Sequence, residues 1–562
     1  MELENKYINK TNISHRKKFA QFFTPETIAD LMSNWLIGNK KLKTVLEPAF
    51  GLGVFSRNLL KKKPNLNIKG FDIDETIFNV AQSFFKINSN VSLNLEDYMF
   101  NDWSNKYDGI ICNPPYFKFH DYDNKNILKE IENRLNFKFN GFTNLYTLFL
   151  LKSIYQLAPN GRMAYIIPSE FLNSDYGKLV KEYLIKTNTL RHLFVIDFKE
   201  NVFDDALTTA SILLLAKDNN DKEINISTIK SKSDLTKIVN YINSYPKSKG
   251  EFTYKPTDLD PNIKWRKYYQ VQNSDKYKNL VPFSKYAKVV RGIATGANDY
   301  FTFRPSKAKE FSIQPDNLLP CICKAKDVKK VFFTSNDFEQ LKQNDELTYL
   351  FDAVKSNNKA VDNYLQKGIE DGINEKFLTK SRKLWYSLEN RPPAPIWVSV
   401  FNRNGLKFIR NEAEISNLTT FHCVYLKQSD LFSTINPDLL FAYLLTDIAK
   451  KIFSDNRREY GNGLKKFEPN DLNKAQVLNL SLLNSETVNL ILNIYKKYRK
   501  GQKQVYIDQI NGIFETEYSQ PESHTHLQFA QSQQHKPKIA KEYVFANAIS
   551  RTENDVRKHN NV

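Results

Sequence analysis

The sequence has little cysteine and no long apolar run, and both absences narrow the classes of protein to which it can belong. Four cysteines among 562 residues are too few for a disulfide framework in a chain of this size. No stretch is long and apolar enough to cross a bilayer, and the charged first residues lack the apolar core of a signal peptide. We therefore expect a cytoplasmic protein without a membrane segment.

Clusters of metal-binding side chains are also missing from the sequence. Cys321 and Cys323 stand in a C-x-C spacing, with no second pair and no nearby histidine. Structural zinc takes clustered ligands, usually about four, so two ordinary thiols are the favoured interpretation. His524 and His526 lie in a polar terminal stretch and form no better candidate. We expect no metal site.

Acidic residues are outnumbered by basic ones, which bears on the partners of the protein. The chain has 62 Asp and Glu against 81 Lys and Arg, a formal net charge of +19. Such an excess favours a polyanionic partner, because each phosphate that is neutralised releases condensed counterions. A solvated basic surface is the alternative, and charge alone does not decide between the two.

The length of 562 residues exceeds that of one typical domain, so we expect two or three. From about residue 24 to 215, short apolar runs alternate with helical stretches, a pattern typical of a mostly parallel sheet wrapped by helices. The predicted strands are Thr44–Leu46, Ile68–Phe71, Val91–Leu95, Gly109–Cys112, Met163–Ile167, Leu193–Ile196 and Ser211–Leu215. We assign this α/β unit to a first domain, residues 1–245.

Two helices of this domain have readable boundaries. Thr24 and Pro25 have the character of an N-cap followed by proline at the first helical position. A second, amphipathic helix is predicted from Tyr146 to Leu157, closed by the turn-forming residues 159–161. Both helices are expected to pack on the predicted sheet.

The rest of the chain has weaker patterns. A charged break at 217–223 precedes a mixed segment, and residues 246–280 are expected to be a connector. The block 281–520 is rich in aromatic residues, Asn and Lys without strand–helix alternation, which indicates a separate mixed α/β domain. Residues 521–562 are rich in Gln, His and Ser and are expected to form a flexible tail.

Polar residues and glycines at the ends of the first three strands indicate a nucleoside site. Gly51 and Gly53 follow the first strand and permit a tight turn with close approach of a ligand to the backbone. Asp72 ends the second strand, where a carboxylate can accept hydrogen bonds from ribose hydroxyls; alone it could equally be a helix N-cap. Asp97 and Tyr98 end the third strand, where a carboxylate can accept from an adenine amino group and a ring can pack on the base.

The fourth strand runs directly into Asn113, Pro114, Pro115 and Tyr116. An amine on an aromatic ring is a poor nucleophile because its lone pair is delocalised. The Asn113 side-chain oxygen and the Pro114 carbonyl can hold both amino hydrogens and pull the nitrogen towards tetrahedral geometry, while Tyr116 stacks on the ring. Stacking and preorganised polar contacts are what an extruded base requires. A lone Asn-Pro-Pro in an arbitrary protein is more often an ordinary loop.

As a set, these segments resemble the gamma-group DNA adenine-N6 methyltransferases of restriction–modification systems. The matching segments are FFTP (22–25), EPAFGLGVF (47–55), GFDID (70–74), EDY (96–98), NPPY (113–116) and ENVFDDALTTAS (200–211). Their order also matches, with cofactor motifs first, the catalytic motif second and the target-recognition domain last. The resemblance covers residues 16 to about 215 and implies a Rossmann-like, seven-stranded methyltransferase sheet with S-adenosylmethionine as methyl donor.

The resemblance also implies roles for individual residues. The implied cofactor-binding residues are Thr24, Glu47, Ala49 and Gly51 at the methionine end, Asp72 at the ribose, and Asp97, Tyr98 and Phe149 at the adenine. The implied catalytic residues are Asn113, Pro114, Pro115 and Tyr116. Phe203 is implied to stack on the flipped target base opposite Tyr116; its alternative is a core phenylalanine before the last strand.

By the same resemblance, the block 281–520 is a target-recognition domain that binds double-stranded DNA. Residues 290–301 resemble the opening of such domains, and residues 383–386, Trp397 and residues 457–466 are weaker matches. The last segment combines cations, Asn and glycines, which suits phosphate contacts in a tight turn. For any one of its cations, a solvated surface is the alternative.

Other functions are compatible with part of this pattern. The NPPY motif also serves methyltransferases acting on RNA adenine or on a protein glutamine amide, which usually need less protein after the catalytic domain. A non-catalytic DNA-binding module would be expected to lose Asn113 or the glycine turn, and both are present. No nuclease-type cluster of paired carboxylates and lysine is found, so a cognate restriction endonuclease, if one exists, is expected to be a separate protein.

Overall fold

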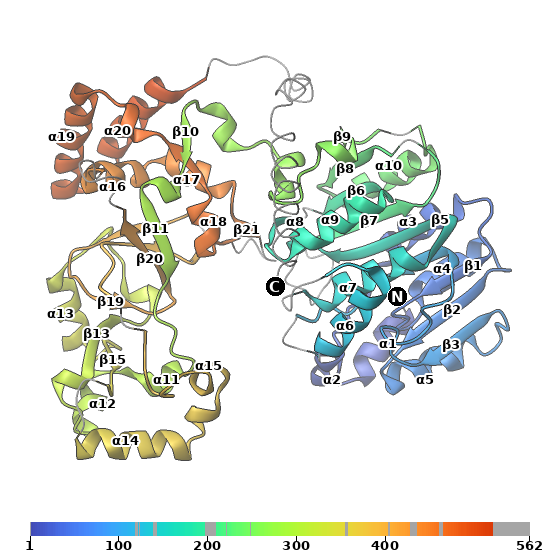
Figure 1. Ribbon diagram of the computed structural model, residues 1–562, viewed down its shortest axis with the longest axis horizontal. Coiled ribbons are helices and arrows are strands. Elements are labelled where there is room, and N and C mark those ends of the chain that lie inside the picture. The colour runs from blue at the N-terminus through green and yellow to red at the C-terminus, as the bar shows by residue number, and fades with distance from the viewer. Residues whose placement is uncertain are drawn as a thin grey trace, which may run out of the picture.

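The computed structural model describes residues 2–118, 122, 124–138, 143–196, 209–220, 222–247, 249–354, 358–389, 391–402, 405–427, 435–459 and 465–520. These residues form two lobes (Figure 1), an N-terminal lobe in blue to green and a C-terminal lobe in yellow-green to red. The N-terminal lobe is built around one large sheet, whereas the C-terminal lobe combines smaller sheets with helices.

A nine-stranded sheet forms the centre of the N-terminal lobe, in the order β3-β2-β1-β4-β5-β7-β6-β8-β9. Its strands are β1 (Thr44–Glu47), β2 (Asn67–Asp72), β3 (Val91–Leu95), β4 (Tyr107–Cys112), β5 (Leu157–Pro168), β6 (Leu190–Ile196), β7 (Ala210–Ala216), β8 (Ile224–Ile229) and β9 (Phe252–Tyr254). From β3 to β5 all neighbours are parallel, and β7 runs antiparallel between β5 and β6. The strands predicted from the sequence are β1 to β7, and all are confirmed.

Two further strands make the sheet larger than the seven-stranded one expected. β8 pairs with β6 in parallel, and β9 pairs with β8 antiparallel. β6 and β7 are buried along their whole length, because both faces of the sheet are covered there, and residues 193–196 and 212–216 in them form continuous apolar runs. β8 mixes polar with apolar residues, and β9 has three residues, all partly buried, so neither produces a run of that kind.

Helices cover both faces of this sheet. α3 (Glu26–Ile37), α4 (Val54–Lys62), α5 (Glu75–Phe85) and α10 (Lys232–Asn243) contribute to the core on one face, and α6 (Asn124–Leu135), α7 (Leu145–Gln156) and α9 (Gly177–Thr187) to the core on the other. Successive strand residues divide between the two cores: Val45 and Ile111 join the first, Leu46 and Ile110 the second. The short helices α1 (Glu2–Lys10) and α2 (Ile13–Lys18) precede this α/β arrangement.

Both predicted helices are present, but two details of their ends were wrong. Pro25 is the N-cap of α3, and the Thr24 hydroxyl accepts a hydrogen bond from Asn113 instead of capping the helix. α7 ends at Gln156 and β5 begins at the next residue, so the predicted closing turn at 159–161 lies within the strand, where Asn160 has a φ of +63°.

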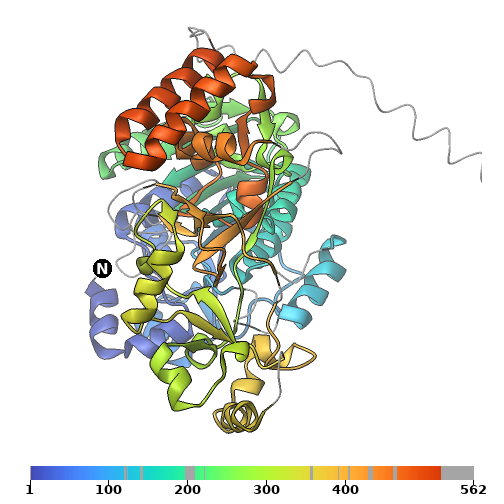
Figure 2. The same cartoon turned by 90° about the vertical axis from the view of Figure 1, so that its left-hand side faces the viewer.

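The C-terminal lobe is a mixed α/β structure, as predicted. Its main sheet has the order β11-β20-β16-β18-β14, formed by β11 (Ala287–Arg291), β14 (Phe332–Phe333), β16 (Ile396–Ser399), β18 (Phe408–Asn411) and β20 (Phe421–Leu426). One large core joins this sheet to α16 (Pro437–Leu445), α17 (Asp447–Ser454), α19 (Ser485–Gly501) and α20 (Gln504–Tyr518). Figure 2 shows α19 and α20 at one end of the lobe and α14 (Lys359–Glu370) at the other.

Smaller sheets complete this lobe. A four-stranded sheet consists of β12 (Thr302–Phe303), β13 (Leu318–Ile322), β15 (Tyr349–Phe351) and β19 (Ser416–Asn417). A three-stranded one consists of β17 (Phe401–Asn402), β21 (Arg458–Glu459) and β22 (Lys465–Lys466), and β10 (Leu280–Pro282) pairs with β23 (Gln476–Leu478). β21 contacts the short helix α8 (Glu170–Asn173) of the N-terminal lobe, which follows β5.

The segment between the lobes is bonded to both of them. Lys264 forms an ion pair with Asp471 of the C-terminal lobe, with 2.8 Å between Nζ and Oδ1. The Arg266 side chain donates to the Arg457 carbonyl oxygen at 2.6 Å, and the Arg266 backbone N–H donates to Asn173 Oδ1 in α8 at 3.1 Å. These bonds connect the segment to both lobes.

Candidate active site

Nearly all the predicted site residues that the structure describes gather where β1, β2, β3 and β4 end. A cavity of about 540 Å³ lies there, within the size range of small-molecule sites. Of the predicted residues, it is lined by Thr24, Glu47, Ala49, Gly51, Asp72, Asp97, Tyr98, Asn113, Pro114, Pro115 and Phe149. The carboxyl ends of parallel strands meet at one edge of a sheet, and this geometry brings the distant motifs together.

The loop after β1 brings backbone atoms to the cavity. Gly51 and Gly53 have φ angles of +53° and +68°, in the left-handed region that glycine tolerates best. A Cβ atom at Gly53 would lie 2.6 Å from the Phe50 ring, so a side chain has no room there. The Gly51 N–H donates to Asp72 Oδ2 at 2.9 Å, which ties the turn to the end of β2.

Two carboxyl groups at the cavity hold their protons more tightly than usual. Burial raises the pKa of Glu47 to about 8 and that of Asp72 to about 6. Glu47 Oε2 accepts from the backbone N–H of Ser56 at 3.1 Å and from its hydroxyl at 2.5 Å. Hydroxyl and ammonium donors of a ligand favour the ionised form of such groups, so this part of the cavity suits a ligand rich in donors.

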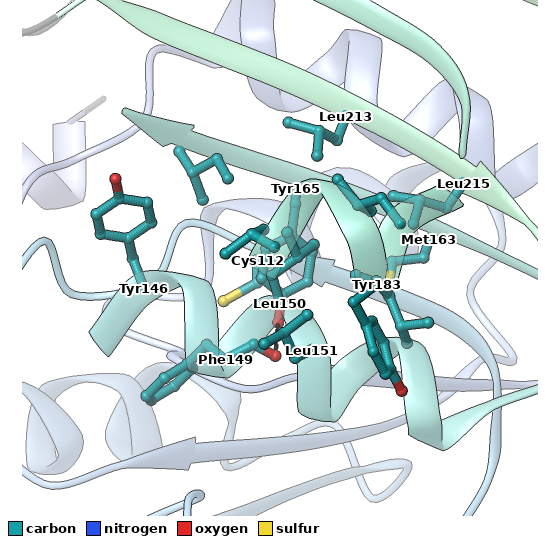
Figure 3. Close-up of a cluster of buried hydrophobic side chains, with 14 of the residues drawn as sticks. Cys112, Tyr146, Phe149, Leu150, Leu151, Met163, Tyr165, Tyr183, Leu213 and Leu215 are labelled. Carbon is teal, nitrogen blue, oxygen red and sulfur yellow. Dashed lines mark hydrogen bonds between the residues drawn. The ribbon is translucent and has the colours of Figure 1, made fainter. Parts of the chain in front are cut away.

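Tyr98 and Phe149 form an aromatic wall of the cavity. Tyr98 is 1% exposed, and its hydroxyl donates to Gln156 Oε1 at 2.6 Å, so the hydroxyl is bonded within the protein interior. The ring centroids of Tyr98 and Phe149 are 5.2 Å apart. Figure 3 shows Phe149 and Tyr146 projecting from α7 in different directions. Tyr98 therefore offers a ligand its ring, beside the carboxylate of Asp97.

Asn113 follows β4, and its side-chain amide is held by the FFTP segment. Nδ2 donates to the Phe22 carbonyl oxygen at 2.9 Å and to Thr24 Oγ1 at 3.0 Å. Oδ1 is buried and accepts no hydrogen bond in the described part of the chain. Buried acceptors are rarely left unpaired, so this oxygen indicates a donor on a ligand. Pro114 and Pro115 lie beside it in the cavity lining and supply no backbone N–H.

Tyr116 does not line this cavity, in contrast to the other predicted residues that the structure describes. Its ring is stacked on that of Phe22, which does line the cavity, with 5.5 Å between centroids and 22° between planes. Tyr146 contacts Tyr116 edge-on at 6.0 Å. A base that stacks on Tyr116 must therefore contact the face of the Tyr116 ring opposite Phe22, or it must displace the Phe22 ring. Phe203, the second predicted stacking residue, lies outside the described residues.

The N-terminal helices contribute contacts that the sequence did not predict. Asp74, two residues after Asp72, accepts from Gln21 Nε2 at 2.6 Å and lies 2.8 Å from His15 Nε2. The Tyr7 hydroxyl of α1 is 3.5 Å from the same carboxylate. Residues 18–24 line the cavity, so Asp74 holds the chain that covers it. The N-terminal helices are charged and carry no motif, so the sequence gave no reason to place them at the cavity. Gln21 lies next to the FFTP segment, and its position could have suggested the contact with Asp74.

Metal ligands do not cluster in the part of the chain that the structure describes. There, no three His, Cys, Asp or Glu side chains are grouped to hold an ion. Cys321 and Cys423 are buried free thiols and Cys323 is a partly buried one. His524 and His526 lie outside the described residues. None of the described helices has the length and apolar character needed to span a membrane.

Most C-terminal segments noted in the sequence shape the interior of their lobe. A Cβ atom at Gly292 would lie 2.1 Å from the Leu418 carbonyl oxygen, so only glycine fits. Tyr300 and Trp385 pack with ring centroids 5.7 Å apart, and Trp397 is fully buried. These positions explain the aromatic and glycine content of the segments without assigning them a DNA contact.

The basic segment 457–466 is described only at its two ends. Lys466 Nζ forms an ion pair with Glu468 at 2.7 Å, and Arg291, at the end of β11, pairs with the same carboxylate at 2.7 Å. Both cations have an acidic neighbour in this structure. Contact between this segment and phosphate groups stays a prediction.

Two family models match the sequence. The model described as N-6 DNA Methylase matches residues 6–295. The model described as Type II methyltransferase M.Eco57I, C-terminal domain, matches residues 263–513. The first contains all the cavity-lining motifs, and the second contains nearly all of the C-terminal lobe.

Similar proteins agree with these matches. The chain is 64% identical over 511 residues to Type II methyltransferase M.AccI of Acinetobacter calcoaceticus, which covers 91% of this chain and 94% of that protein. It is 21% identical to Type II methyltransferase M.XamI of Xanthomonas campestris pv. amaranthicola, over 82% of this chain and 86% of that protein. A nuclease-deletion mutant of the Type ISP restriction-modification enzyme LlaGI, solved in complex with a DNA substrate mimic, shares the fold with a TM-score of 0.51 at 14% identity, over 84% of this chain and 55% of that one. The chain belongs to the N-6 DNA methylase family.

Proposed function

We propose that this protein is a site-specific DNA methyltransferase that transfers a methyl group from S-adenosylmethionine to N6 of adenine in a short duplex sequence. The observation that carries the proposal is Asn113, whose buried Oδ1 has no hydrogen-bond partner among the described residues and lies beside a cavity lined by three strand-end carboxyl groups. The similarity to type II methyltransferases over nearly the whole chain supports DNA as the substrate.

The residues of the cavity fit S-adenosylmethionine. The ligand has donors along its whole length: a methionine ammonium, ribose hydroxyls and an adenine amino group. Glu47, Asp72 and Asp97, at the ends of β1, β2 and just after β3, are carboxyl acceptors that these donors can reach in turn. Ala49 and Gly51 complete the methionine end, Thr24 lies in the lining next to Asn113, and the rings of Tyr98 and Phe149 are available to the adenine. When bound, S-adenosylmethionine supplies a methyl group already activated by its sulfonium, so no base has to deprotonate the amine first.

The NPPY residues act on the target amine. Asn113 Oδ1 and the Pro114 carbonyl accept its two hydrogens and localise the lone pair on nitrogen, an electrostatic effect fixed before the reaction. Pro115 stiffens the turn that aims these acceptors. Tyr116 and Phe203 stack on the adenine once it has left the duplex, since the atom to be methylated is out of reach inside the helix.

The two lobes divide the work between chemistry and recognition. We assign residues 1–245 to the catalytic domain, 246–280 to a connector, 281–520 to a target-recognition domain that binds duplex DNA, and 521–562 to a tail. The match of residues 263–513 to the family model of a type II methyltransferase C-terminal domain supports the assignment of a target-recognition domain. The protein would act in the bacterial cytoplasm as the modification component of a restriction–modification system, with any cognate endonuclease as a separate chain.

The test is methyl transfer from labelled S-adenosylmethionine to unmethylated genomic DNA, followed by nucleoside analysis and methylome sequencing. N6-methyladenine at one recurring short motif is expected. Label that is absent from DNA but present on RNA or on a protein glutamine would overturn the proposal and require another role for the C-terminal lobe. N4-methylcytosine or 5-methylcytosine would overturn its adenine specificity alone.

A further inference from the structure

The side-chain amide of Asn113 has a definite orientation in this structure, and the FFTP segment sets it. A side-chain amide has an acceptor end and a donor end that can exchange by rotation through half a turn. The Phe22 carbonyl oxygen, 2.9 Å from Asn113 Nδ2, can only accept, so it requires the donor end. Thr24 Oγ1, 3.0 Å from the same nitrogen, takes the second N–H. Both amide hydrogens are thereby used, and the oxygen faces away from FFTP.

This orientation decides what the site can do with an amine. The target amine presents two hydrogens and needs acceptors. The Asn113 oxygen can accept one of these hydrogens, whereas the Asn113 NH₂ group in the same place would repel the amine. Thr24 is 2% exposed, so water does not compete for its hydroxyl. Pro25, the N-cap of α3, follows Thr24 directly, and α3 is buried along one face, which anchors the hydroxyl. Gln21, bonded to Asp74 at 2.6 Å, anchors the other end of the segment.

We propose that Thr24 is a positioning residue for methyl transfer: its hydroxyl, together with the Phe22 carbonyl, holds the Asn113 amide with its oxygen towards the amine. The inference rests on the proposed function and refines it. It gives Thr24 a role in turnover that differs from the contact with the methionine end of the cofactor that family resemblance implies. The two roles predict different kinetic behaviour.

The test compares Thr24→Val, which keeps the shape and removes the hydroxyl, with Thr24→Ser, which keeps the hydroxyl. Loss of one partner of a buried N–H is expected to lower kcat by roughly ten- to a hundredfold in Thr24→Val. The dissociation constants for S-adenosylmethionine and for DNA should stay within about twofold, and 2-aminopurine fluorescence at the target position should show normal base extrusion. Thr24→Ser should restore kcat to within about threefold of the wild type.

A matched control is Thr187→Val, at the end of α9, whose hydroxyl donates to the Leu184 carbonyl oxygen at 3.3 Å, outside the cavity lining. It is expected to leave kcat unchanged. If Thr24→Val unfolds at the assay temperature, Thr24→Ala replaces it under the same criteria.

Three results would overturn the proposal. A higher dissociation constant for S-adenosylmethionine with unchanged kcat would assign the hydroxyl to the cofactor. A Thr24→Val enzyme as active as the wild type would remove any role for the hydroxyl, and a Thr24→Ser enzyme as slow as Thr24→Val would assign the effect to packing of the methyl group. Failure of the proposed function itself is distinguishable, because the wild type would then leave DNA unmethylated.

Discussion

At the scale of single residues, the Asn113 side-chain oxygen is expected to lower the stability of the folded protein as long as no ligand is bound. A buried polar atom without a hydrogen-bond partner destabilises the folded chain by about 1–3 kcal/mol. The same residue uses both of its N–H groups, so the arrangement is not a loosely packed amide. Asn113 Oδ1 has no partner among the described residues and lies at a cavity lined by carboxyl acceptors, so a hydrogen-bond donor of the substrate would pair with it.

Replacing Asn113 by alanine should therefore abolish turnover while sparing binding. We expect kcat to fall by about a hundred- to a thousandfold or more, the range found when one preorganised polar group is removed from an active site. The dissociation constants for DNA and S-adenosylmethionine should change little, as measured by fluorescence anisotropy and calorimetry. Ser33→Ala is the matched control, since the Ser33 hydroxyl is also buried without a partner in the described chain but lies outside the cavity lining. Retained turnover in Asn113→Ala would contradict the proposed role.

The raised pKa of Asp72 makes cofactor binding depend on pH. In the free protein burial raises this pKa to about 6, and hydroxyl donors of the ribose bind the ionised carboxylate better than the neutral acid. The contribution of Asp72 to S-adenosylmethionine affinity should thus be complete above about pH 6 and decline as the pH drops through that value, because binding must then displace a proton; Glu47, whose pKa is about 8, gives a separate change at higher pH. Asp72→Asn should bind more weakly at pH 8 and lose the change near pH 6, while it keeps the change near pH 8 that Glu47 produces. Titration calorimetry from pH 5 to 8 would show this difference; equal slopes near pH 6 in both proteins would contradict the assignment.

Single residues were also where prediction from sequence was most and least successful. Motif residues such as Gly51 and Asp72 line one cavity, because each lies beside a strand end that the apolar pattern had located; their roles toward a ligand stay predictions. The partner of Thr24 was not predicted, since Asn113 is 89 positions away and local pattern favoured a helix cap. Nor was the Phe22–Tyr116 stack, which depends on how two loops meet in space.

At the scale of elements, one carboxylate connects both N-terminal helices to the chain that lines the cavity, beside the ion pair between Glu4 and Arg57 and the packing of Tyr7. Asp74 bonds to Gln21 and His15 and also caps α5, accepting from the Thr76 N–H at 3.1 Å. The inner strands were predictable because burial on both faces demands continuous apolar runs. The first two helices were not, because they carry many charges, and long-range contacts such as those with Asp74 and the ion pair between Glu4 and Arg57 explain where they lie.

Asp74→Ala should release this cover from the cavity. Losing hydrogen bonds to a charged acceptor is worth about 1.5–3 kcal/mol, so we expect the dissociation constant for S-adenosylmethionine to rise by roughly ten- to a hundredfold. Limited proteolysis should cleave within residues 2–20 sooner than in the wild type. Asp30→Ala serves as the control, because Asp30 pairs with Lys62 at the surface and its side chain is 43% exposed. Unchanged affinity and unchanged cleavage would show that the helices are held by other contacts.

At the scale of the whole molecule, a net charge of +19 should make DNA binding strongly dependent on salt. The logarithm of the association constant is expected to fall linearly with the logarithm of salt concentration, by about 0.9 per phosphate contact. Affinity for S-adenosylmethionine in the same salt series should change far less, since its charges are bound inside a cavity. Fluorescence titrations between 50 mM and 200 mM salt would separate the two. DNA affinity that does not change with salt concentration would imply that the excess positive charge faces away from the duplex.

The joint between the lobes should matter for DNA but not for the cofactor, because every cavity-lining residue belongs to the N-terminal lobe. Lys264 and Asp471 form their ion pair with side chains only 23% and 4% exposed, so removing the lysine takes away the cation that faces a nearly buried carboxylate. We expect Lys264→Ala to lower kcat/KM for DNA by roughly tenfold or more as the lobes lose their alignment, with S-adenosylmethionine affinity unchanged. Lys61→Ala, which breaks a pair with 70% and 40% exposed side chains, should have little effect.

The double variant Lys264→Met with Asp471→Asn distinguishes alignment from simple loss of stability, because Asn can still accept from the Glu468 N–H, which donates to Asp471 Oδ2 at 2.9 Å. Replacing both partners by neutral side chains leaves neither charge buried without the other, but the neutral pair does not reproduce the direction of the ion pair. If alignment is what matters, the double variant should unfold at nearly the wild-type temperature and still methylate DNA slowly. If it recovers full activity, the pair contributes only stability, and the placement of the lobes is determined by the Arg266 contacts with Asn173 and Arg457.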